Sequence, residues 1–265
     1  MSAWIPLPHL TGLRLEGEDA LAFAHAQFTI PFEADQAPGW RVGAWCNPKG
    51  KVISVMLARS FQTEVDLVIP TSQRAFVSTR LPLYAIGRKV NVSAPLAVAG
   101  SLQAPDAPFR RLEPDSKRGL DFLEDGLVDG PELAARWRFL DMRAGLAWLS
   151  PARSEQFLPQ ALGLEERGGL SYRKGCYPGQ EVIARVHYLG KAKERLAAFQ
   201  LSSRAPCDDQ ELVDGAGRRL GRTLDSLIRD EDTIGLAVVE SQSPSGTEIS
   251  CAGEAGRLCE PTELC

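Results

Sequence analysis

One cysteine in a basic, glycine-containing segment is the strongest candidate for chemistry in this sequence. The segment reads Lys174-Gly175-Cys176-Tyr177-Pro178-Gly179-Gln180-Glu181. Pro178 favours the first turn of a helix, because a proline lacks the N–H group that would be unpaired there anyway. We therefore expect Cys176 just outside a helix N-terminus, where partial positive charge favours a thiolate. Arg173 and Lys174 add two full positive charges beside it, so the pattern indicates a reactive thiol.

A structural role in a tight turn is the alternative for this cysteine. Free cysteine is among the residue types most often buried, and Gly175 and Gly179 suit a sharp turn as well as the close approach of a ligand. A nucleophile also needs a base within reach. His187 lies two to three turns along the expected helix, so we expect a surface residue there rather than a partner for Cys176.

Composition and the remaining motifs exclude several functional classes. The chain has 265 residues, 44% of them hydrophobic and 24% charged, as in an ordinary globular protein. Its net charge of -4 argues against direct nucleic-acid binding, and no run nears the ~18 apolar residues that span a membrane. Phosphate loops, serine-hydrolase elbows and HExxH motifs are absent. Six cysteines without a CxxC pair predict neither a disulfide scaffold nor a metal site from Cys251, Cys259 and Cys265, and a reducing cytoplasm is expected.

Hydrophobic periodicity divides the chain into two parts. We expect an α+β core over 1–190 and an antiparallel β domain over 191–265, with a boundary near Lys191. A hairpin is expected around the turn Asn47–Lys51, and the stretch 95–130 reads as a loop-rich connection. The expected strands of the core are 13–17, 40–46, 52–60, 64–70 and 89–93, its expected helices are 18–28, 71–80 and 132–144, and the C-terminal strands are 195–201, 211–213, 219–228, 233–239 and 247–250.

The cysteine segment resembles the signature of the YgfZ-type folate-binding proteins. These are relatives of the glycine-cleavage T-protein that act in iron–sulfur enzyme maintenance and tRNA modification. The resemblance covers most of the chain and is weakest between about 96 and 137, where this chain is shortened. It implies three lobes in a ring around a central channel for tetrahydrofolate or a one-carbon derivative, with Cys176 near the folate's reactive end. Further matching segments are Gln27-x-Thr29, Cys46–Lys51, Phe157–Gln160, Gly168–Tyr172 and Val182–Arg185.

Departures from the family pattern bear on the chemistry. The T-protein has a catalytic aspartate where Ser54 aligns here, and a hydroxyl cannot supply that carboxylate's charge or acid–base role. Aminomethyl transfer is therefore not expected. Relatives often carry a pterin-binding glutamate where this chain has Arg143, a donor-only residue, so either Asp141 replaces it or the pterin binds differently. The folate-contacting residues that the resemblance implies are Lys174, Tyr177, Gly179, Gln180, Asp141, Arg143, Ser54 and Gln27.

Three functions follow from these observations. The favoured one is a folate-binding accessory factor for iron–sulfur proteins, with Cys176 as the functional thiol and with cluster-assembly or client proteins as partners. Its link to tRNA then passes through a cluster-containing modifying enzyme, without direct nucleic-acid contact. The alternatives are a tetrahydrofolate-dependent one-carbon transferase and a non-catalytic folate-sensing or scaffold module in which Cys176 is structural.

Overall fold

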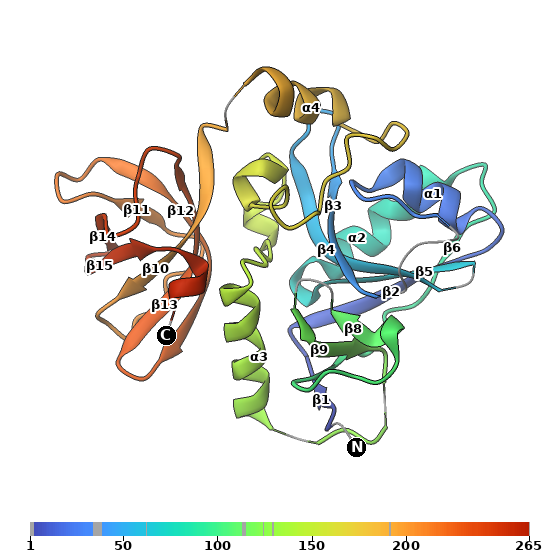
Figure 1. The fold of residues 1–265 in the computed structure, drawn as a ribbon, viewed down its shortest axis with the longest axis horizontal. Helices are drawn as coiled ribbons and strands as arrows, with labels where there is room; N and C mark the ends of the chain where they lie inside the picture. The colour runs from blue at the N-terminus through green and yellow to red at the C-terminus, as the bar shows by residue number, and fades with distance from the viewer. Residues whose placement is uncertain are drawn as a thin grey trace.

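Two antiparallel sheets lie on one side of helix α3 (Pro131–Arg143), and a β-barrel lies on its other side (Figure 1). The computed structural model describes residues 3–33, 39–61, 63–112, 115–123, 125–128, 130–190 and 192–264. None of the helices in these ranges is long and apolar enough to cross a membrane. The boundary expected near Lys191 lies outside the described residues.

The larger sheet has five strands in the order β3-β4-β5-β2-β6 and is covered on both faces. On one face, Phe23 of α1 and Val77 of α2 are buried with alternate strand residues. The opposite face packs towards α3 and the barrel, in a second cluster that contains Val55 and Trp137. The strands are β2 (Leu10–Glu16), β3 (Arg41–Cys46), β4 (Val52–Phe61), β5 (Glu64–Pro70) and β6 (Asn91–Val92), and the helices are α1 (Ala20–Gln27) and α2 (Arg74–Arg80).

The smaller sheet is built mostly from the segment that we expected to be rich in loops. Its four strands follow the order β1-β7-β9-β8. The expected run at 96–98 ends just before β7, although Leu96 forms an isolated bridge with Gly12. The strands are β1 (Ile5–Pro6), β7 (Ala99–Ser101), β8 (Arg111–Leu112) and β9 (Asp115–Asp121). Short 3-10 helices occupy Thr71–Gln73, Leu81–Ala85, Pro108–Arg110, Pro151–Arg153, Pro159–Leu162 and Pro261–Glu263.

The C-terminal strands close into a barrel in the order β10-β13-β12-β11-β14-β15, which confirms the expected antiparallel β structure. The sequence did not predict β15, whose residues 254–259 include alanine and glycine and lack β-branched side chains. This strand closes the barrel by pairing with β10 and β14. A disulfide joins Cys207 to Cys251. The strands are β10 (Glu194–Leu201), β11 (Glu211–Val213), β12 (Arg219–Arg229), β13 (Asp232–Glu240), β14 (Glu248–Cys251) and β15 (Glu254–Cys259).

Candidate functional site

The cysteine segment is a loop that leads into α4 (Gln180–Leu189), and the helix begins later than expected. Gly179 caps the helix with φ of 80°, so Pro178 lies before the helix and not in its first turn. A side chain at Gly179 would bring its Cβ within 2.4 Å of Gly50 Cα in the β3–β4 turn. Close packing against that turn therefore requires glycine, and it sets the start of the helix. As a consequence, Cys176 lies in the preceding loop and not beside the first helical N–H groups.

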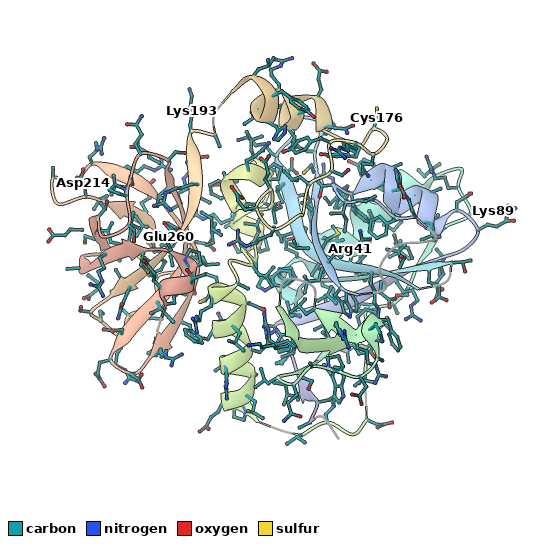
Figure 2. The ribbon with its side chains drawn as sticks, in the orientation of Figure 1. Arg41, Lys89, Cys176, Lys193, Asp214 and Glu260 are labelled. Carbon is teal, nitrogen blue, oxygen red and sulfur yellow. A yellow bond between two sulfur atoms is a disulfide. The ribbon has the colours of Figure 1, made fainter. Side chains whose placement is uncertain are left out.

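Cys176 is presented to solvent on this loop. Figure 2 shows it at the outer edge of the molecule, next to α4. It is exposed, whereas Cys46 and Cys259, the other free cysteines in the described ranges, are buried. Burial raises the pKa of the Cys46 thiol, which keeps that sulfur protonated. Of these three free thiols, Cys176 is therefore the one that a reagent or partner can reach.

Lys174 anchors the loop to the end of α1. Its Nζ donates to the backbone oxygens of Phe28 at 2.6 Å and Ile30 at 3.3 Å, and it also contacts the His25 oxygen. Burial lowers the pKa of Lys174 to about 8, so the ammonium remains the main form at neutral pH. An ammonium group has three N–H donors, and three carbonyls occupy them here. Lys174 therefore positions the loop and has no donor left over for a folate.

Two polar groups near the loop lack partners. Tyr177 is 5% exposed, and its hydroxyl is buried without a hydrogen bond among the described residues. The Gln27 Oε1 atom at the end of α1 is in the same state. Gln180 makes a long contact, 3.5 Å from its Nε2 to the Lys174 oxygen. Buried polar atoms are normally paired, so Tyr177 and Gln27 are the predicted residues here that retain capacity for a ligand.

The remaining predicted residues lie elsewhere and are not brought together with the loop. Ser54 is completely buried, and its hydroxyl donates to the Val55 oxygen at 3.1 Å. Asp141 is buried and accepts from Arg118 at 2.7 Å and from the Trp148 indole at 3.0 Å. Arg143 is exposed and donates to the Thr262 oxygen at 3.3 Å. Asp141 is therefore held in an internal ion pair, and Arg143 faces the C-terminal residues.

The histidines divide between the loop and other places. His187 is exposed, as expected, where it stacks on Tyr172 at 4.0 Å and contacts Glu165. The sequence gave no indication that His25 would lie beside the cysteine loop. A Cβ atom added at Gly175 would be 3.9 Å from His25 Nε2. The two segments are far apart in the sequence, so only the folded chain shows that they are neighbours.

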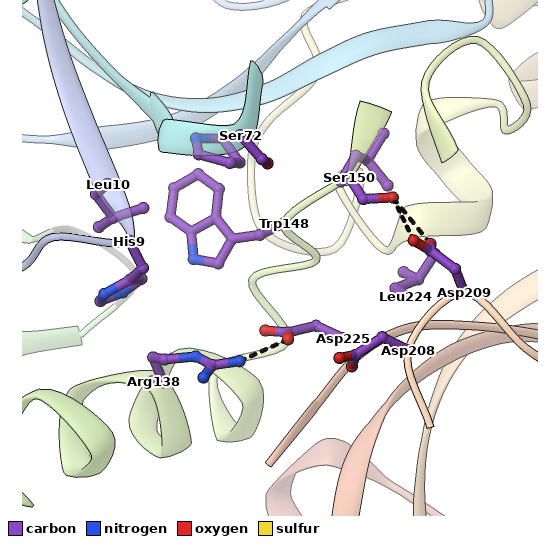
Figure 3. Close-up of a pocket in the computed structure, with 12 residues that line it drawn as sticks. His9, Leu10, Ser72, Arg138, Trp148, Ser150, Asp208, Asp209, Leu224 and Asp225 are labelled. Carbon is purple, nitrogen blue, oxygen red and sulfur yellow. Dashed lines mark hydrogen bonds and ion pairs between the residues drawn. The ribbon is translucent and has the colours of Figure 1, made fainter. Parts of the chain in front are cut away.

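A pocket of about 270 Å³ lies where β2, the segment after α3 and the barrel meet. Figure 3 shows Trp148 in its wall, the Arg138–Asp225 ion pair at 2.7 Å and the bond from Ser150 to Asp209 at 2.8 Å. The Nε2 atom of His9 is buried without a partner in the described chain. Burial lowers the pKa of His9 to about 4 and raises the pKa of the Asp225 carboxyl. No residue of the cysteine loop is among those that line this pocket.

Comparisons with known proteins agree on the relationship. No family model matches the chain. A "tRNA-modifying protein YgfZ" of Klebsiella pneumoniae (strain 342) is 30% identical over 265 residues, which cover 85% of this chain and 81% of that protein. The protein of the same name from Colwellia psychrerythraea is 25% identical over 89% of this chain and 84% of its own length. An uncharacterized protein of Haemophilus influenzae is 28% identical over 90% of this chain and 89% of its own length.

One solved structure shares the fold. The glycine cleavage system aminomethyltransferase T from Bartonella henselae superposes with a TM-score of 0.70. The superposition covers 98% of this chain and 85% of that one, at 14% sequence identity. The α+β fold expected from the sequence, with a T-protein-like arrangement and a C-terminal barrel, is therefore confirmed.

Proposed function

Because the chain belongs to the family of proteins named tRNA-modifying protein YgfZ, we propose that it is a folate-binding accessory protein for tRNA modification. In this proposal it acts in the cytoplasm and supports iron–sulfur clusters in client or assembly proteins, one of which modifies tRNA. Cys176 is the functional thiol. The observation that carries the proposal is the exposure of Cys176 on a loop fixed on both sides, by Lys174 at α1 and by Gly179 at the β3–β4 turn.

The chemistry of a single soft thiolate limits the role of Cys176. A cluster is usually held by about four ligands, so one cysteine can contact or transfer a cluster but cannot hold it alone. In the described chain no group of three His, Cys, Asp or Glu residues could hold a metal ion. The proposed action of Cys176 is therefore transient and depends on a partner that supplies the other ligands.

The pocket beside Trp148 suits the pterin head of a folate. The amino and ring N–H groups of a pterin need acceptors, and Asp208, Asp209 and Asp225 supply carboxylate oxygens. His9 adds a buried nitrogen without a partner in the described chain. The volume of about 270 Å³ is at the small end for ligand pockets, and its carboxylates disfavour the anionic glutamate tail. The pterin would bind inside while the tail remains in solvent.

A titration tests the folate part of the proposal. Tetrahydrofolate should bind the wild-type chain by calorimetry, and Ser72→Trp should abolish binding because Ser72 is an exposed residue at the pocket. Arg143→Glu is the control, because Arg143 does not line this pocket and its replacement should leave the affinity unchanged. Binding that is absent from the wild type and appears only in Arg143→Glu would show that the pocket is wrongly assigned.

A replacement of one sulfur atom tests the thiol. In cells that lack this protein, Cys176→Ser should fail to support a cluster-dependent tRNA-modifying enzyme, while its thermal unfolding matches the wild type because the residue is exposed. Cys46→Ala is the control, because the buried Cys46 thiol cannot reach a partner. Full support by Cys176→Ser would contradict the proposal and favour a scaffold role. The one-carbon transferase alternative gains no support, because Ser54 is buried and offers no carboxylate.

A further inference from the structure

The ring of His25 is held next to the backbone that carries Cys176. His25 lies in the last turn of α1, and its Nε2 atom is 3.9 Å from the place of a Cβ at Gly175. We propose that His25 is a positioning residue, which donates a hydrogen bond from Nε2–H to the Cys176 thiolate and so keeps that sulfur ionised. This inference rests on the proposed function of Cys176 and deepens it.

The orientation of the ring follows from the contacts of its other nitrogen. The Phe32 N–H group donates to His25 Nδ1 at 3.3 Å, so the neutral ring carries its proton on Nε2. A protonated ring can instead donate from Nδ1 to the Phe32 oxygen, also at 3.3 Å. In both states the Nε2–H group is a donor on the side of Gly175. The donor is therefore present throughout the neutral pH range.

Lys174 fixes the distance between the two segments. It contacts the His25 oxygen directly and donates to the Phe28 oxygen at 2.6 Å, so the residue two before Cys176 is tied to the helix that carries His25. On the other side of Cys176, Tyr177 is buried with its ring centroid 4.9 Å from Lys174 Nζ. The cysteine is held between two anchored residues while its own side chain is exposed and can turn toward Nε2.

The charges around this pair favour a thiolate. Arg173 and Lys174 come from the loop itself. Arg41 comes from β3, with its guanidinium 5.5 Å from the Phe32 ring centroid and a 2.9 Å bond to the Pro31 oxygen. Glu33, the opposing charge, follows Phe32 and is exposed. In the step itself the Cys176 S–H bond breaks, the proton passes to water or buffer, and the electron pair left on sulfur accepts the Nε2–H bond.

Alkylation kinetics test the inference. The rate of iodoacetamide reaction at Cys176 is measured against pH in a Cys265→Ser background, which removes a cysteine outside the described ranges. His25→Leu should slow the reaction about tenfold at pH 7 and move the midpoint of the profile up by about one pH unit, since a hydrogen bond to a charged group has this order of strength. His25→Gln, which keeps an N–H donor, should stay within about twofold of the parent.

Controls separate a hydrogen bond from a structural effect. His187→Leu should leave the profile unchanged, because His187 contacts Glu165 and Tyr172 instead. If His25→Leu does not fold, the nitrogen NMR shifts of the His25 ring in wild type and Cys176→Ser decide, because a real bond must alter the Nε2 signal. An unchanged alkylation profile in folded His25→Leu, or an unchanged Nε2 signal, overturns the inference. A shifted profile together with full function of Cys176→Ser would reject the proposed function and leave this inference intact.

Discussion

Asp141→Ala should lower the free energy of unfolding by about 3–5 kcal/mol, the range for removing one partner of a buried ion pair. Asp141 and Arg118 are each 1% exposed, and 2.7 Å separates the carboxylate from the guanidinium. The Arg118 guanidinium also lies 4.5 Å from the Trp137 ring centroid, inside the core. The substitution leaves a buried positive charge without this carboxylate and removes the acceptor of the Trp148 indole.

Urea denaturation of three variants separates the contributions to this effect. Asp141→Asn keeps an oxygen for the Trp148 indole but not the charge, so its loss of stability should be smaller than that of Asp141→Ala. The double variant Arg118→Met, Asp141→Leu should recover most of the stability, because it removes both charges together. If Asp141→Ala instead unfolds within about 1 kcal/mol of the wild type and loses only folate affinity, Asp141 serves the pterin and not the core.

The sequence predicted the elements of this fold better than the contacts between them. Alternating apolar residues identified the hairpin of β3 and β4 and five of the six barrel strands, because each pattern is local. The start of α4 was placed too early because it depends on Gly179 packing against Gly50, a contact between distant segments. Likewise, Asp141 was expected to be free for a pterin, and its partner Arg118 comes from a strand in the segment that read as loops.

The candidate site shows the same division. The reactive residue was evident from the types of its neighbours, and the exposure of Cys176 agrees with the role predicted for it. His25 could not be found, because it is one of three scattered histidines until the chain folds. The pocket was equally hidden, since His9, Trp148 and Asp225 come from separate segments and share no motif.

Acid should destabilise the protein through His9. Burial lowers its folded-state pKa to about 4 from an ordinary value of 6.5; the Arg138 charge adds to this, and Asp141 opposes it. Between these two pH values the unfolded chain binds a proton at His9 that the folded chain does not bind. The free energy of unfolding therefore rises with pH across this window, and lowering the pH from 6.5 to 4 should remove roughly 3 kcal/mol through this one group.

Denaturation midpoints measured between pH 4 and 7 test this expectation with two variants. His9→Gln cannot titrate in this range and should flatten the slope, whereas His187→Gln, at an exposed position, should retain it. An equal slope in wild type and His9→Gln would show that His9 is not held neutral. A flattened slope would mean that the folded pocket holds a neutral imidazole whose Nε2 is free for a ligand among the described residues. Tetrahydrofolate that binds this nitrogen should then steepen the wild-type slope, because it stabilises only the neutral, folded form.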